Sequence, residues 1–356
     1  MSNLKNKNTR NGKIDLIRFL CAVSIAGYHL GCSVKYENEW FMCGYMAVEF
    51  FFIVSGFLLA KSLSKLKPET EDDYVNACVA SVWKRYLTFI PYYIVVVILT
   101  LIAWVPAFEL TFEEWKIKAL EAIPNILLLQ MFGFKTADWF IPTWYLSAMM
   151  LSIMILAPIL IKKGKFYSLY VSPAVSFLLL GLVYKKFGNF NVNSFSWDGI
   201  INYGMFRAFA EISLGCTAYY IVSSGYLQKF NKIALYVIGY LCTAGLLAYI
   251  YIGIDPTLQF SMIILSFLAV MIAFFDNDTL KFLNNGFVYL LGRLSLPIFL
   301  THSIVRYQIL DVPTLKTYGA QMSAFLMSTL LLSVICLLIG DFLNKRITVK
   351  KNKNKK

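Results

Sequence analysis

The sequence predicts an all-α, polytopic integral membrane protein with about ten transmembrane helices in one bundle. The first observation is composition: 58% of the 356 residues are hydrophobic and only 15% are charged, whereas soluble proteins average about 25% charged residues. The second is that apolar runs of roughly 20 residues, the length needed to cross a bilayer, recur along the whole chain. The third is that lysine and arginine residues divide unevenly between alternate loops.

The apolar runs leave room for one membrane domain and two short basic ends. We expect a basic leader at 1–13, a transmembrane domain at 14–343 and a basic, disordered tail at 344–356. Within the domain, the expected spans are 14–33, 40–61, 87–106, 144–161, 166–184, 203–223, 233–253, 257–275, 290–310 and 320–343.

The distribution of basic residues predicts that both termini are cytoplasmic. With a cytoplasmic N-terminus, 23 of the 33 lysine and arginine residues lie on the inner side, nine lie on the outer side, Arg207 and Arg306 among them, and Arg18 lies within a span. This imbalance follows the positive-inside rule. The net charge of +13 therefore indicates topology and contact with anionic membrane lipid. Nucleic acid is not expected as a partner, because the basic residues are spread over many short loops.

The first expected span carries three ionisable residues, Asp15, Arg18 and His29. Eleven helical positions separate Arg18 from His29, so both project from one face, about 16 Å apart along the axis, with Asp15 close to that face. A charge facing lipid costs roughly 2.5–3.5 kcal/mol on insertion scales, so the face should turn to the bundle interior. The alternative is that Arg18 snorkels to the inner interface and His29 is a buried core histidine.

Other polar residues in or near spans are further candidates for function. Glu49 needs a partner, either a cation or His29 on the neighbouring helix. Arg207 and Glu211 have the i,i+4 spacing of a structural ion pair, with ligand binding as the alternative. Trp144 and Tyr145 are expected either in the aromatic belt at the membrane interface or stacked on a sugar. His302 is either part of a functional site or a core histidine.

Two features on the outer side each allow two interpretations. The segment 106–142 is expected to form an interfacial or re-entrant helix over the acceptor entrance, or an amphipathic helix lying on the bilayer. Cys32 and Cys43 fall near the outer ends of the first two spans. Two free thiols are expected there, with a disulfide as the alternative.

Several sequence blocks together resemble the acyltransferase 3 family of integral membrane acyltransferases. They are Asp15-x-x-Arg18 with His29, Glu49 followed by Phe51-Phe52-x-x-Ser55-Gly56-Phe57-Leu58-Leu59, Trp83-Lys84-Arg85 with Pro91-Tyr92-Tyr93, Trp144-Tyr145-Leu146-Ser147, and Leu291–His302. In combination and order they cover nearly all of the chain. The sequence departs from the family pattern at Tyr45, Met46 and Ala47, where an arginine is often found, and at Met149, where many members have glutamate.

The resemblance implies transfer of an acyl group, usually acetyl, from cytoplasmic acyl-CoA to a hydroxyl of a cell-envelope glycan or lipid-linked sugar, in the bacterial cytoplasmic membrane. His29 matches the family's essential histidine, Arg18 its companion arginine and His302 its late histidine. His29 would act as a base or as a transient acyl carrier, since imidazole titrates near neutral pH, and Glu49 could fix its tautomer. Arg18, Lys84 and Arg85 are suited to the phosphates of CoA. Acetyl-CoA is thus the expected donor, and no metal is expected.

Two other classes of protein are alternatives to an acyltransferase. A secondary transporter or flippase would also carry intramembrane Asp, Glu, His and Arg residues. However, no internal repeat of the span pattern and no matching pair of Gly/Pro-broken segments is evident in the sequence. A non-catalytic membrane scaffold would not require deep ionisable residues on one helix face.

Overall fold

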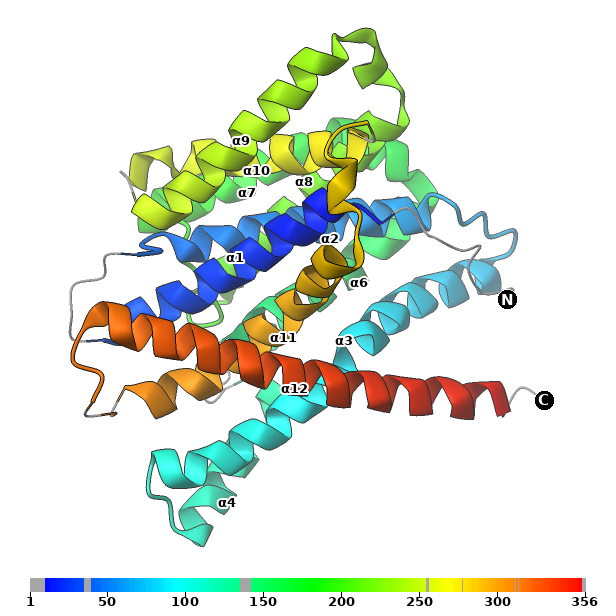
Figure 1. The fold of residues 1–356 in the computed structure, drawn as a ribbon. Coiled ribbons are helices and arrows are strands. Elements are labelled where there is room, and N and C mark those ends of the chain that lie inside the picture. Colours follow the sequence, from blue (N-terminus) through cyan, green and yellow to red (C-terminus); the bar gives the residue numbers. More distant parts are fainter. Residues whose placement is uncertain are drawn as a thin grey trace, which may run out of the picture.

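A long helix lies over each of the expected spans in the computed structural model (Figure 1). The structure describes residues 10–34, 40–134, 142–253, 256–276, 278–310, 312 and 314–353. The long helices are α1 (Gly12–Gly31), α2 (Ala47–Leu63), α3 (Glu71–Ala107), α6 (Trp144–Phe166), α7 (Ser172–Phe187), α8 (Tyr203–Ser223), α9 (Lys232–Ile252), α10 (Gln259–Phe275), α11 (Gly286–Ile309) and α12 (Tyr318–Lys353). The all-α class is confirmed, since the structure is 82% helical.

Seven segments of the described chain are long and apolar enough to cross a membrane, and one of them joins α6 and α7 into a single 44-residue unit. Helix α10 has only 17 residues, and α8 is not among the seven. The protein is therefore a multi-pass membrane protein. The number of crossings and the cytoplasmic location of the termini stay predictions.

Two helices are longer than the expected spans. A capping box between Thr70 and Asp73 starts α3 sixteen residues before the expected span 87–106. Helix α12 continues to Lys353, so the prediction of a disordered tail is wrong for residues 344–353. The start of α3 and the end of α12 reach beyond the other helices at the same end of the bundle (Figure 1).

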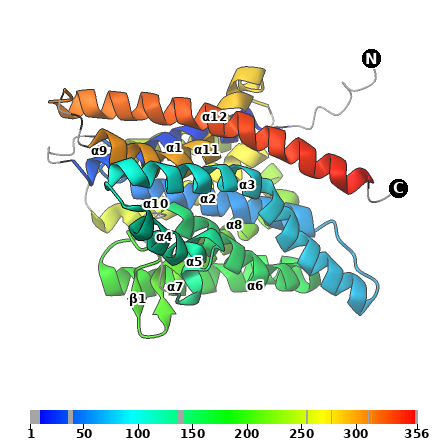
Figure 2. The ribbon, with the colours of Figure 1, turned by 90° about the horizontal axis from the view of Figure 1, so that it is seen from below.

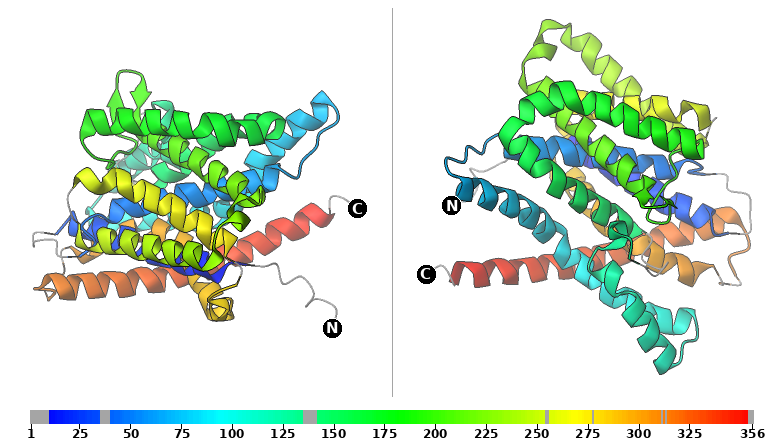
Figure 3. Two further views of the ribbon diagram at one scale, coloured as in Figure 1. Left: turned by 90° about the horizontal axis from the view of Figure 1, so that it is seen from above. Right: turned by 180° about the vertical axis from the view of Figure 1, so that it is seen from behind.

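Close helix pairs form the interior of the bundle. Helix α1 packs on α11, α2 on α8, α7 on α8, α9 on α10, and α11 on α12, as the views from other sides also show (Figures 2 and 3). The tightest crossing is between α2 and α8, where a side chain at Gly56 would overlap the carbonyl oxygen of Ile212, and one at Gly215 would overlap that of Ile53. Glycine at both positions therefore allows the two helix backbones to approach closely.

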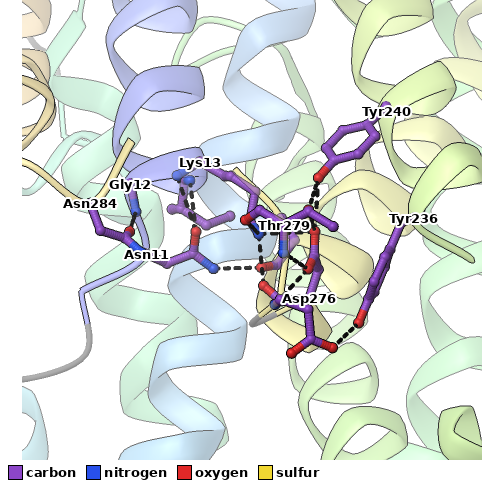
Figure 4. A network of polar contacts seen from close by, with 11 residues as sticks. Asn11, Gly12, Lys13, Tyr236, Tyr240, Asp276, Thr279 and Asn284 are labelled. Atoms are coloured by element: carbon purple, nitrogen blue, oxygen red, sulfur yellow. Dashed lines mark hydrogen bonds and ion pairs between the residues drawn. The ribbon is translucent and has the colours of Figure 1, made fainter. Parts of the chain in front are cut away.

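A polar network fixes the start of α1 to the loop after α10 (Figure 4). The ammonium group of Lys13 lies 2.9 Å from Asp276 Oδ2 and donates hydrogen bonds to the carbonyl oxygens of Asp276 and Thr279. Tyr240 of α9 donates to Asp276 Oδ2 over 2.8 Å. Helix α1 thus meets the consecutive helices α9 and α10, which are distant from it in sequence, at one carboxylate.

Short elements cap the bundle at the opposite end. They are the 3₁₀ turn η1 (Gly44–Met46), helices α4 (Phe112–Glu121) and α5 (Ile123–Ile126), the 3₁₀ turn η2 (Gln130–Phe132), and a hairpin of β1 (Trp197–Asp198) and β2 (Ile201–Asn202). The apolar side chains of Phe112, Ile117 and Leu120 on α4 are exposed. This exposure is compatible both with an interfacial or re-entrant helix and with an amphipathic helix lying on the bilayer, the two alternatives expected for 106–142. Residues 135–141 of that segment, including Asp138, lie outside the described part of the chain.

Candidate active site

Helix α1 joins two polar regions at opposite ends of the bundle. Asn11 caps its start by accepting a hydrogen bond from the backbone N–H of Lys13. The helix is continuous from Gly12 to Gly31, so Arg18 and His29 lie about 16 Å apart along its axis. We call these regions the Arg18 end and the His29 end.

A cavity of about 360 Å³ opens at the Arg18 end, and four cationic side chains line it. They are Arg10, Arg18, Lys84 and Arg293. Because α1, α3 and α11 converge here, the cavity collects positive charge from segments far apart in sequence. Arg18 and Lys84 were predicted to bind donor phosphates, whereas the roles of Arg10 and Arg293 were not anticipated.

Two of the four cations form ion pairs with carboxylates of the described chain, and the other two do not. Asp15 is ion-paired with Arg10, and Asp341 with Arg293. Among the described residues, no carboxylate lies within 4.0 Å of Arg18 or Lys84, so both remain available for an anion. Guanidinium and ammonium groups in such a cavity favour a phosphate ligand.

Arg85, the third predicted phosphate anchor, does not line this cavity. The Tyr145 hydroxyl lies 3.3 Å from Ser55 Oγ. Tyr145 is only 8% exposed and its ring contacts Phe52. Trp144 is 7% exposed, and its ring lies 6.0 Å from that of Phe52. Both side chains therefore lie inside the bundle, and the prediction that they belong to an interfacial belt is wrong.

A continuous row of rings connects Tyr145 with His29. The Phe299 ring centroid lies 5.4 Å from that of Tyr145 and 6.1 Å from that of His302. His302 in turn stacks on His29 at 5.1 Å with an interplanar angle of 19°. The two histidines of the chain, 273 positions apart, thus form one pair.

The histidine pair has free hydrogen-bonding capacity. His302 is 1% exposed, and its Nδ1 lies 3.2 Å from the Ile298 carbonyl oxygen. Its Nε2 has no hydrogen-bond partner among the described residues. A buried ring nitrogen without a partner is uncommon in native proteins and is typical of a functional site.

Arg306 adds a buried cation beside the histidines. It lies one helical turn after His302 and is 8% exposed. One Nη donates to Tyr307 Oη over 2.7 Å, while Nε has no partner in the described structure. The prediction from the distribution of basic residues was that Arg306 lies in an outer loop. Its i+4 spacing from His302 was the signal that could have identified it.

Glu49 pairs with Arg207, so the partner found is a cation. Arg207 Nε donates to Glu49 Oε2 over 2.9 Å, and one Nη lies 2.8 Å from Glu49 Oε1. Glu211 Oε1 lies 3.5 Å from Arg207 Nε, so the predicted i,i+4 pair is confirmed. Neither oxygen of Glu49 is hydrogen-bonded or ion-paired with His29 in the described ranges, so Glu49 cannot fix the tautomer of that imidazole directly.

The charged triad of Glu49, Arg207 and Glu211 is almost fully buried, at 0–1% exposure. Arg207 is thus inside the bundle and not among the outer charges where the charge count had placed it. Arg207 lies within ion-pair distance of both carboxylates, and loss of one partner of such buried charges would be costly. Near the same end, Cys32 and Cys43 are free thiols, as expected.

Comparison with known proteins identifies one family. The sequence profile of the family described as "Acyltransferase domain" matches residues 11–343. No curated protein and no solved structure matches the chain. The matched range contains Arg18, Lys84 and Arg293 of the Arg18 end, the row of rings and the His29 end.

Proposed function

Because the chain belongs to the acyltransferase 3 family, we propose that it transfers an acyl group, in the first instance acetyl, from acyl-CoA to a sugar hydroxyl. The donor binds at the Arg18 end and the acceptor at the His29 end. The acceptor is a cell-envelope glycan or a lipid-linked sugar, and the protein acts in the bacterial cytoplasmic membrane with the Arg18 end facing the cytoplasm.

The observation that carries this proposal is the arrangement of two polar regions on one helix. A cavity lined by two cations without a carboxylate partner in the described structure lies at one end of α1. Near the other end lie two stacked imidazoles, and Nε2 of His302 has no hydrogen-bond partner among the described residues. CoA has phosphates at one end and its acyl thioester at the end of an extended pantetheine arm. The separation of about 16 Å along α1 is the kind of distance that this arm would bridge.

The chemistry requires a base, an oxyanion-stabilising group and a leaving thiolate. As a base, His29 would take the proton of the acceptor hydroxyl while its oxygen forms a bond to the acyl carbon. The bond from that carbon to sulfur then breaks, and the proton passes to the CoA thiolate. In the alternative route, the acyl group rests transiently on His29. Both routes are compatible with the stacked histidines, and Arg306 supplies positive charge for the oxyanion.

The decisive test compares cells that carry the intact protein with cells that carry His29→Ala at equal membrane abundance. Envelope glycans are released without base and analysed by mass spectrometry for ester-linked acyl groups. We expect the intact protein to add a defined acyl mass and the variant to add none. The matched control is Tyr170→Phe, a conservative change at a 70% exposed side chain between α6 and α7, which should leave the ester unchanged.

Two outcomes would contradict the proposal at different levels. If His29→Ala added the same ester as the intact protein, His29 would not be the reacting residue. If the intact protein added no ester, the transporter or flippase interpretation would replace the acyltransferase one.

A further inference from the structure

Two loops contact Tyr28, the residue before His29 on α1, and two buried side chains join these loops. One loop contains the turn η1 with Tyr45, and the other follows α7 and contains Phe190, Asn191 and Val192. These loops lie more than 140 positions apart in the sequence. Their junction is therefore a product of the tertiary structure.

Arg207 is the first link between the loops. One of its Nη atoms donates to the Tyr45 carbonyl oxygen over 2.9 Å, and the other donates to the Val192 carbonyl oxygen over 3.4 Å. Its remaining hydrogen-bonding capacity is directed at Glu49. A guanidinium whose donors are fixed in a plane holds such partners at a defined separation.

Gln259, at the start of α10 and 1% exposed, is the second link. Its Nε2 donates to Tyr45 Oη over 2.6 Å, and its Oε1 accepts from the Phe190 N–H over 2.7 Å. Arg207 and Gln259 thus each hold both loops. Two buried polar side chains used for the same purpose indicate that the relative position of the loops matters.

The loops present an uncharged polar and aromatic surface beside His29. The Tyr28 ring lies 5.4 Å from the His29 ring and 5.2 Å from the Tyr45 ring. Asn191, an exposed side chain, donates from Nδ2 to Tyr28 Oη over 2.8 Å. Tyr28 and Tyr45 are half-buried, so their rings are partly accessible.

We propose that Tyr28, Tyr45 and Asn191 form the binding surface for the sugar acceptor, and that Arg207 and Gln259 are positioning residues for it. This inference rests on the proposed function. An amide that both donates and accepts suits neighbouring hydroxyls of a sugar ring. Partly exposed tyrosine rings offer apolar faces together with a polar edge. Arg207 is paired with Glu49 and Glu211 and so offers no free positive charge to an anionic group, which favours an uncharged sugar.

The experiment uses the full-length protein in proteoliposomes with radiolabelled acetyl-CoA. Two acceptor fractions come from cells that lack the protein: a water-soluble envelope polysaccharide and an organic extract of lipid-linked sugars. The transfer rate is measured against the concentration of each fraction and against that of acetyl-CoA. The fraction that the intact protein labels identifies the source of the sugar.

The variants Asn191→Ala, Tyr28→Phe and Gln259→Leu address the surface and its positioning. Since a lost hydrogen bond costs roughly one factor of ten in binding, we expect each to raise the apparent KM for the labelled fraction about tenfold. The KM for acetyl-CoA should stay within about twofold. Asn76→Ala and Tyr170→Phe, at exposed positions on α3 and between α6 and α7, are the matched controls and should change neither constant.

The outcomes separate this inference from the proposed function. If the intact protein labels a fraction while all three variants keep its KM, or if both KM values rise together, the acceptor surface is not where we place it. If the intact protein labels neither fraction, the proposed function itself fails and the acceptor assignment fails with it.

Discussion

In the described part of the chain, the unpaired nitrogens at the His29 end distinguish it from the ion-paired arginines elsewhere in the bundle. Arg10, Arg207 and Arg293 are all charged, yet each is occupied by a carboxylate. By contrast, His302 Nε2 and Arg306 Nε are buried and have no partner among the described residues. Burying a polar atom without a partner costs about 1–3 kcal/mol. Such a cost is tolerated where a ligand supplies the missing bond.

Arg306 should therefore contribute to the transition state more than to donor binding. Removing one oxyanion-stabilising donor typically lowers kcat by 10²–10³. We expect Arg306→Gln to lower acetyl transfer by about 100-fold while the Kd of acetyl-CoA, measured by calorimetry, is unchanged. Arg306→Lys should keep part of the activity, because it keeps the charge. A normal transfer rate in Arg306→Gln would remove this residue from the mechanism.

Arg18 and Lys84 should act in the opposite manner, on donor binding. A charge-assisted hydrogen bond contributes about 1.5–3 kcal/mol, so Arg18→Ala or Lys84→Ala should weaken acetyl-CoA binding about 10- to 100-fold. Added salt should reduce the difference from the intact protein. Lys229→Ala, which removes an exposed cation outside the cavity, is the control. Equal affinities for all four proteins would place the donor elsewhere.

At the scale of helices, the α2–α8 crossing holds the buried triad together. Glu49 lies on α2, and Arg207 and Glu211 lie on α8. Their geometry depends on the close approach at Gly56 and Gly215, where neither position has room for a Cβ atom. The same crossing fixes Arg207 in the position from which it reaches both loops.

Gly56→Ala should consequently destabilise the protein. Overpacking typically costs about 1–3 kcal/mol, and we expect a lower midpoint in thermal unfolding of the detergent-solubilised protein. The control is Gly181→Ala in α7, where no atom lies within 4 Å of the new Cβ. That change should be neutral or stabilising by about 0.5–1 kcal/mol, because alanine favours the helix. A Gly56→Ala protein as stable as the intact one would show that the crossing can relax.

The helices and the local pairs followed from sequence, whereas the long-range pairs did not. Arg207 and Glu211 were predicted to pair because i,i+4 spacing brings them together in any helix. Helical spacing does not predict the partner of Glu49, because that partner is 158 positions away in the sequence and on another helix. The stacking of His29 on His302 likewise depends on how α1 packs against α11. The prediction for Trp144 was wrong because an aromatic residue at the end of a span can face either the membrane interface or the bundle interior. Only the packing of the helices determines which of the two it faces.

At the scale of the whole molecule, Asp276 fastens the start of α1 to α9 and α10 (Figure 4). Burial alone would raise the pKa of Asp276, but hydrogen bonds from Thr279, Lys13 and Tyr240 outweigh it and lower the pKa below its usual range. A carboxylate whose pKa is lowered by folding stabilises the protein at pH values above its unfolded pKa. For aspartate this value is about 3.9.

Asp276→Asn should therefore destabilise the protein at pH 7, by about 1.5–3 kcal/mol for the lost charged bonds. Protonation removes the same contribution from the intact protein, so its advantage in thermal midpoint should shrink as the pH falls below about 4. Asp198→Asn is the control, because Asp198 is an exposed partner of Lys186 and exposed pairs contribute at most about 1 kcal/mol. A pH-independent difference between the intact protein and Asp276→Asn would mean that packing, and not the charge of Asp276, joins these helices.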